Sequence, residues 1–143
     1  MKRALVLLWL LVGIAVSSSA CSQIKLGDVL DKGGKLMPAG DARALLSGAK
    51  VSGTTSGGAQ FDSRYVPNGE IEGSISGPRG MSMLSGTWKI NDRGQVCADA
   101  LVVSGRGQRI GGCYFYFRLG DEYYVSESSD ERSADALKRT VSK

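Results

Sequence analysis

Apolar and polar residues alternate in short segments between positions 48 and 126, and glycine-containing turns separate these segments about every ten residues. In the clearest case, alternate residues from Phe61 to Tyr65 share one face, and the turn Pro67-Asn68-Gly69 follows. Ile71 and Ile75 then alternate with polar residues on the way back. This pattern predicts a β-hairpin.

Further strands are predicted at Leu84 to Ile90, Gln95 to Val103, Cys113 to Leu119 and Glu122 to Ser126. Turn residues separate them, most clearly Asn91 to Gly94 and Gly120-Asp121. Many short antiparallel strands with regular turns are typical of small β domains. The sequence therefore predicts a mainly β fold, a small antiparallel barrel or sandwich of about 6–8 strands.

Two regions favour helix instead. Pro38 and Asp41 stand at the start of the helix-forming run Ala42 to Leu46, and Gly48 stands where a helix would end. This predicts one short N-terminal helix. The segment from Asp130 to Val141 allows a short C-terminal helix as well.

The beginning of the chain has a different pattern. Two basic residues precede thirteen apolar residues, Ala4 to Val16, and a run of small residues ends at Ala20. This is typical of an export signal, and the run is too short to span a bilayer core of about 30 Å. We expect residues 1–20 to be removed and Cys21 to carry fatty acyl chains such as palmitate. Ordinary cleavage after Ala20, without a lipid, is the alternative.

Without the signal, 123 residues remain, enough for one domain with its own core. The polar, glycine-bearing residues 21–37 are predicted to form a tether, and residues 38–143 one β-rich domain. With Cys21 acylated, Cys97 and Cys113 remain as a pair in an oxidising compartment. We therefore predict a disulfide between them.

Strand alternation places every second side chain on the same face as the two cysteines. The apolar residues predicted to lie in the core on that face are Leu101, Val103, Phe115 and Phe117. The opposite face carries side chains that can stack on and hydrogen-bond to a partner. The predicted partner-binding residues, taken with Trp88, are Tyr114, Tyr116 and Arg118. Alternatively, a helix or a second sheet covers this face.

The chain has no histidine, which excludes a His general base, a Ser-His-Asp triad and a His-containing zinc site. Glu70 and Glu72 lie two apart on one strand face, with Cα atoms about 7 Å apart, a separation near that of glycosidase carboxyl pairs. Surface carboxylates on a solvated strand face are far commoner. We therefore predict no catalytic residue, no metal, no cofactor and no enzyme activity.

The net charge of +4 falls to +2 without residues 1–20, because 16 Lys and Arg then face 14 Asp and Glu. This mild excess gives no support to nucleic-acid binding.

Several short motifs stand out: Leu45-Leu46-Ser47-Gly48, Gly86-Thr87-Trp88, Val96-Cys97 and Cys113-Tyr114. In these motifs the chain resembles a family of small exported proteins of Gram-negative bacteria classed as a domain of unknown function. The resemblance covers about residues 42–128 and implies a fold and an envelope address without an activity. The anchor, the Gly-x-Trp strand and the cysteine pair are also loosely similar to periplasmic lipoproteins that inhibit proteases or lysozyme.

Together these features predict a non-enzymatic outer-membrane lipoprotein that faces the periplasm. We expect the membrane to be one partner, through the lipid, and an envelope protein or a glycan to be the other. A soluble periplasmic or secreted protein is the alternative location. The alternative function is inhibition of a secreted hydrolase, a protease or lysozyme.

Overall fold

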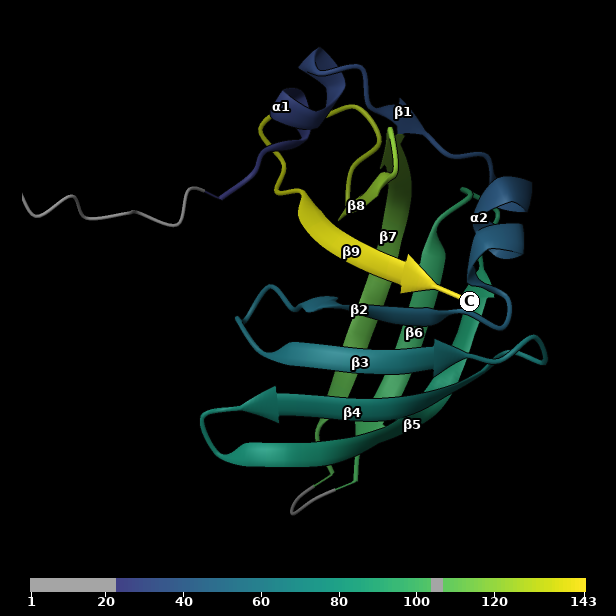
Figure 1. The fold of residues 1–143 in the computed structure, drawn as a ribbon, viewed down its shortest axis with the longest axis vertical. Helices are drawn as coiled ribbons and strands as arrows, with labels where there is room; N and C mark the ends of the chain where they lie inside the picture. Colours follow the sequence, from purple (N-terminus) through teal and green to yellow (C-terminus); the bar gives the residue numbers. More distant parts are fainter. Residues whose placement is uncertain (1–22, 104–106) are drawn as a thin grey trace, which may run out of the picture.

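The described part of the chain forms a closed antiparallel barrel of eight strands, β2 to β9, with two short helices and one additional short strand (Figure 1). The computed structural model describes residues 23–103 and 107–143. The elements are α1 (Leu26–Asp31), β1 (Lys35–Leu36), α2 (Ala39–Leu46), β2 (Lys50–Thr54), β3 (Gln60–Tyr65), β4 (Glu70–Gly77), β5 (Gly80–Ile90), β6 (Val96–Val102), β7 (Arg109–Leu119), β8 (Glu122–Ser126) and β9 (Leu137–Ser142).

Neighbouring strands from β2 to β9 pair antiparallel in chain order, and the pairing of β9 with β2 closes the sheet. β9 pairs with β2 as well as β8, and β7 pairs with β6 through its first half and with β8 through its second. In Figure 1, strands β2, β3 and β4 run across β6 and β7 behind them. The mainly β prediction is confirmed, and a barrel replaces the two-sheet alternative.

Inward-facing side chains fill the barrel and form the larger core cluster. Its buried members on the strands are Val51, Tyr65, Ile71, Trp88, Val96, Tyr116 and Val125. Ala42 and Leu46 of α2 complete the cluster, so this helix covers one end of the barrel (Figure 1). The predicted N-terminal helix is thus confirmed, and its packing keeps water away from that end of the core.

Two glycines permit neighbouring strands to approach closely. A Cβ at Gly73 of β4 would lie 2.1 Å from the carbonyl oxygen of Asp62, and one at Gly86 of β5 would lie 2.1 Å from that of Asp99. Both contacts are with backbone on the adjacent strand. Glycine at such positions lets strands bend sharply, which a small closed barrel requires.

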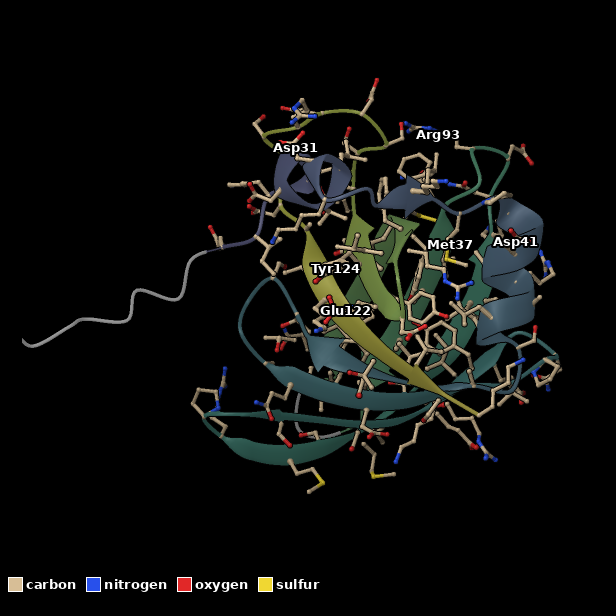
Figure 2. All side chains as sticks on the ribbon, turned by 45° about the horizontal axis from the view of Figure 1, so that its top comes forward. Asp31, Met37, Asp41, Arg93, Glu122 and Tyr124 are labelled. Carbon is tan, nitrogen blue, oxygen red and sulfur yellow. A yellow bond between two sulfur atoms is a disulfide. The ribbon has the colours of Figure 1, made fainter. Side chains whose placement is uncertain are left out.

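The region predicted as a tether is folded from Leu26 onward, so that prediction is wrong there. Leu26 and Val29 of α1 are buried and pack on the outside of the barrel against Phe115, Phe117, Tyr124 and Ala136. Leu26, Val29 and Leu30 have the three- and four-residue spacing of a helix face. An ion pair of 2.5 Å between Arg132 and Asp31, which lies at the end of α1 (Figure 2), adds to this attachment.

The allowed C-terminal helix is not formed, because the tail supplies strand β9. Leu137, Arg139 and Val141 alternate toward the interior, opposite Val125, Tyr123 and Val51 on the flanking strands. Without β9, the strands β2 and β8 would be open edges. Sheet closure therefore outweighs the helix propensity of this segment.

Candidate functional site

The predicted partner-binding residues do not form one surface. Trp88 and Tyr116 are each only 5% exposed and belong to the barrel core, against which the half-buried Tyr114 also packs. Arg118 alone is exposed, and its Nε donates a hydrogen bond to the Gly120 carbonyl (2.9 Å). The prediction of a binding face made of these four residues is therefore wrong.

The reason lies in which face of β7 points inward. Side chains alternate along β7 as expected, but the face that carries Cys113 points out of the barrel rather than into its core. Phe115 and Phe117 are buried on that outer face because α1 covers them, while Tyr114 and Tyr116 point into the barrel. Leu101 and Val103, predicted as core on the cysteine face, are exposed on the outside.

Trp88 has a structural role inside the barrel. Its indole Nε1 donates a hydrogen bond to the Val66 carbonyl (2.8 Å), and its ring tilts against Tyr65 with centroids 5.4 Å apart. Burial raises the pKa of Tyr65, and burial together with the neighbouring Tyr65 raises the pKa of Tyr116 well above its ordinary value. Both tyrosines are therefore neutral in the folded protein.

This burial predicts a loss of stability in alkali. The tyrosines of the unfolded chain ionise near pH 10, whereas folded Tyr116 keeps its proton. The contribution of Tyr116 is therefore complete below pH 10 and is lost as the pH rises above that value. We expect Tyr116→Phe to reduce the alkaline slope of the unfolding free energy, measured by denaturant titration at several pH values. Ionisation of Tyr116 near pH 10 in the folded protein, followed by tyrosinate absorbance, would contradict its burial.

Arg139 is the interior group that sequence analysis did not identify. It is 7% exposed, and its Nη1 donates hydrogen bonds to the carbonyls of Thr54 and Lys138 (3.0 Å each). Its guanidinium lies 5.0 Å from the centroid of the Phe61 ring. No carboxylate of the described residues pairs with it. Burial lowers the pKa of this arginine, and nearby Tyr116 opposes that shift.

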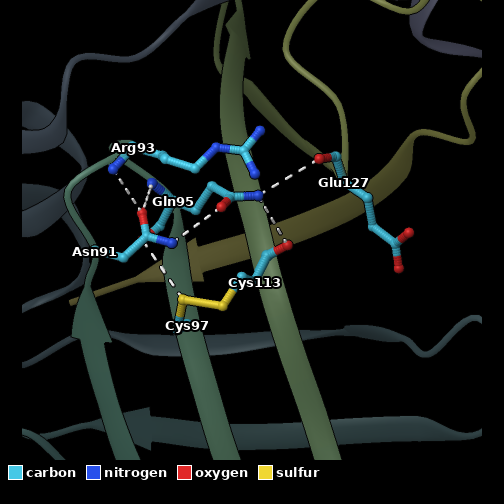
Figure 3. Close-up of a disulfide and its surroundings, with 6 residues drawn as sticks. All are labelled: Asn91, Arg93, Gln95, Cys97, Cys113 and Glu127. Atoms are coloured by element: carbon cyan, nitrogen blue, oxygen red, sulfur yellow. Dashed lines mark hydrogen bonds between the residues drawn. A yellow bond between two sulfur atoms is a disulfide. The ribbon is translucent and has the colours of Figure 1, made fainter.

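The predicted disulfide is present between Cys97 on β6 and Cys113 on β7, which are directly opposite each other with Cα atoms 4.0 Å apart (Figure 3). The adjacent turn is held by Asn91, whose side-chain oxygen accepts a hydrogen bond from the Gln95 backbone (3.0 Å). The amide of Gln95 reaches the carbonyls of Cys113 and Glu127 (3.4 and 3.5 Å). The predicted lipidation site, Cys21, lies outside the described residues, as does the predicted signal peptide.

The carboxylates that sequence analysis singled out lie on the surface. Glu70 and Glu72 are exposed on the outside of β4, and Glu70 accepts a hydrogen bond from the side chain of Asn68 (2.9 Å). On β8, Glu122 pairs with Lys138 and accepts a hydrogen bond from the Tyr124 hydroxyl (2.8 Å). Figure 2 shows Glu122 and Tyr124 close together. These two partners, Lys138 first, hold the pKa of Glu122 below its usual value. A lowered pKa keeps Glu122 ionised and unsuited to act as a general acid.

The most distinctive surface feature is an exposed group of apolar side chains on β5, on β6 and on the residue after β6, which we call the apolar patch: Met81, Met83, Leu101 and Val103. Met81 and Met83 are 72% and 62% exposed. Val103 adjoins Met83, because its backbone N–H donates to the Met83 carbonyl (2.8 Å). The outward position of both methionines could have been predicted from the sequence. They occupy odd-numbered positions of the strand, whereas the core residues Leu84 and Trp88 occupy even-numbered ones, so alternation places them on the opposite face.

Other kinds of site receive little support. Two shallow grooves of about 350 and 370 Å³ lie on the surface, one beside α1 and one across β2, β3 and β4. Within residues 23–103 and 107–143, no three side chains of His, Cys, Asp or Glu gather where they could share a metal ion. In that same part of the chain, no helix is long and apolar enough to cross a membrane.

Comparison of the chain with family models, with curated proteins and with solved structures gives no match. The resemblance to small exported proteins of Gram-negative bacteria, and the looser one to inhibitor lipoproteins, therefore stay predictions.

Proposed function

We propose that this protein is a non-enzymatic lipoprotein of the cell envelope, acylated at Cys21 and facing the periplasm from the outer membrane. It acts by binding a partner or supporting the envelope through the outer face of its barrel. The apolar patch replaces the predicted binding face of Tyr114, Tyr116, Arg118 and Trp88 as the proposed binding surface.

The observation that carries the binding role is the exposure of Met81 and Met83 on β5 beside Val103, with Leu101 two residues before Val103 on β6. Soluble monomers rarely expose large contiguous apolar surface without an interaction that uses it. Methionine side chains are flexible and polarisable, so they adapt to the shape of a partner. An envelope protein suits this surface better than a glycan, because a glycan would need more hydrogen-bonding groups than these four side chains provide.

The export part of the proposal rests on the three cysteines. Cys97 and Cys113 form a disulfide on the outer face of the barrel, which suits an oxidising compartment. Cys21 follows the apolar run and the small residues of the predicted signal. The lack of histidine and the surface positions of Glu70 and Glu72 support a non-enzymatic role.

Replacing Cys21 tests the anchor. We expect the wild-type protein to fractionate with the outer membrane and its mature mass to equal the chain from Cys21 plus acyl groups. Cys21→Ser removes the acyl acceptor and should leave that fraction, whereas Ser22→Ala keeps the cysteine and should remain in it. Mass spectrometry and membrane fractionation measure both effects.

Two outcomes would contradict parts of this proposal. Mature protein with a free Cys21 thiol in the soluble periplasm would exclude the lipid and leave export intact. Recovery of the whole chain from the cytosol, with three reduced cysteines, would exclude export as well.

Inhibition of a hydrolase receives less support from the fold. The hairpin of β4 and β5 ends in a two-residue turn, Pro78-Arg79, between the paired residues Gly77 and Gly80. Such a tight turn offers little extended chain to fill an active-site cleft. From Leu26 onward the N-terminal segment is held on the barrel, so little of it remains to act as a plug.

A further inference from the structure

We infer that the end of the barrel that carries α1 rests on the membrane surface, with Ile24 and Lys32 at the lipid headgroups. This inference rests on the proposed acylation of Cys21. It adds an orientation, in which the apolar patch faces away from the membrane.

The start of the described chain is firmly attached to the barrel. The Leu26 N–H donates to the Ala134 carbonyl (2.8 Å), and the Ala136 N–H donates to the Ile24 carbonyl (2.9 Å). Lys25 adds an ion pair of 2.5 Å with Asp135. The chain from Ile24 onward therefore moves with the barrel as one body.

This attachment leaves very little chain between the lipid and the barrel. Three residue steps separate Cys21 from Ile24, the first residue bonded to the barrel, which is about 10 Å at full extension. A tether over residues 21–37 would instead span roughly 55 Å when extended and would allow many orientations. The acylated residue must therefore lie within about 10 Å of Ile24, and the surface around Gln23 and Ile24 must lie near the headgroups.

The surface around Gln23 has side chains suited to a membrane interface. Ile24 is 38% exposed, and Gln23 and Ile24 line the shallow groove beside α1 together with Asp28, Asp31, Lys32 and Tyr124. Of the two carboxylates, Asp31 is paired with Arg132. A lysine stem can lie along apolar surface while its ammonium reaches a lipid phosphate. The exposed Lys32 and Ile24 thus offer one cationic and one apolar contact to the interface.

The apolar patch lies at the other end of the molecule. In Figure 1, α1 is at the top, while the hairpin of β4 and β5 is at the bottom. Met81 and Met83 follow that hairpin turn directly. With α1 at the membrane, the patch stays in the aqueous compartment, where a protein partner can reach it.

Site-specific fluorescence in vesicles tests this orientation. Lys32→Cys and Arg79→Cys each place one free thiol at an exposed position, because Cys97 and Cys113 are bonded and Cys21 is acylated. The labelled, acylated proteins are inserted into vesicles of phosphatidylethanolamine and phosphatidylglycerol with nitroxide-labelled headgroups. We expect quenching at position 32 to be severalfold stronger than at position 79.

A variant with a long flexible insertion provides the matched control. Fifteen or so Gly and Ser residues between Ser22 and Gln23 keep the acyl group but allow a separation of roughly 20 Å or more. The difference between positions 32 and 79 should then largely disappear. Equal quenching at both positions without the insertion, or stronger quenching at 79, would overturn the orientation. Absence of acyl groups by mass spectrometry would overturn the proposed anchor itself, and the orientation with it.

Discussion

Gly86→Ala is expected to destabilise the barrel by about 3 kcal/mol or more, or to prevent it from closing. The new Cβ would lie 2.1 Å from the Asp99 carbonyl oxygen and 2.5 Å from the Ala100 Cα. Both are backbone atoms of the neighbouring strand β6, so no side-chain rotation can relieve the contact. Denaturant unfolding, followed by tryptophan fluorescence, measures the loss.

Gly77→Ala is the matched control for this substitution. Gly77 also lies in a strand, at the end of β4, but a Cβ there would meet nothing within 4 Å. We expect a change within about 0.5 kcal/mol. If Gly86→Ala proved equally harmless, β5 and β6 could not approach as closely at this point as the structure has them.

Arg139→Ala is expected to cost about 3 kcal/mol of unfolding free energy, the sum of lost packing and lost hydrogen bonds. The substitution removes a nearly buried side chain from the interior and leaves the Thr54 and Lys138 carbonyls without their Nη1 donor. It also removes the contact with the Phe61 ring, a cation–π interaction of about 1 kcal/mol. Denaturant unfolding at neutral pH measures the change.

Two further variants separate these contributions. Arg139→Met keeps most of the apolar stem and removes the charge whose burial lowers the arginine pKa, so its loss should be smaller than that of alanine. Arg64→Ala, at an exposed position on β3, should change stability by less than about 0.5 kcal/mol. Equal stability of Arg139→Ala and the wild type would show that the interior does not depend on this guanidinium.

The order of strands and turns from β3 to β8 could be predicted from the sequence, because local signals specify both. The turn Pro67-Asn68-Gly69 and the alternation on either side produced β3 and β4 as expected. Gly120-Asp121 joined β7 to β8 in the same way. These features depend on a few adjacent residues, and the fold does not overrule them.

The inner and outer faces could not be assigned in this way. β7 is apolar on both faces, with Phe115 and Phe117 on one and Tyr114 and Tyr116 on the other. Only the packing of α1 on the outside shows why both faces are buried. A six-residue helix carries too few positions for its pattern to be distinguished from a polar tether.

Sequence analysis missed the last strand, β9, because of a single residue. Leu137 and Val141 alternate as in a strand, but the position between them that faces the interior is Arg139. A charged residue there breaks the apolar pattern on which strand prediction depends. The carbonyls and the aromatic ring that make this arginine tolerable come from β2, β3 and β9, and only the folded barrel brings them together.

The pairing of β9 with β2 has a consequence for how the protein matures. Val51 and Val141 pair although about 90 positions of the chain separate them. The barrel therefore cannot close until all the strands between them have been synthesised. During synthesis and translocation, the edge of β2 that later pairs with β9 would have exposed backbone donors and acceptors. Other polypeptides could form hydrogen bonds with this edge. A factor that shields nascent chains would therefore matter most in the interval before Val141 arrives.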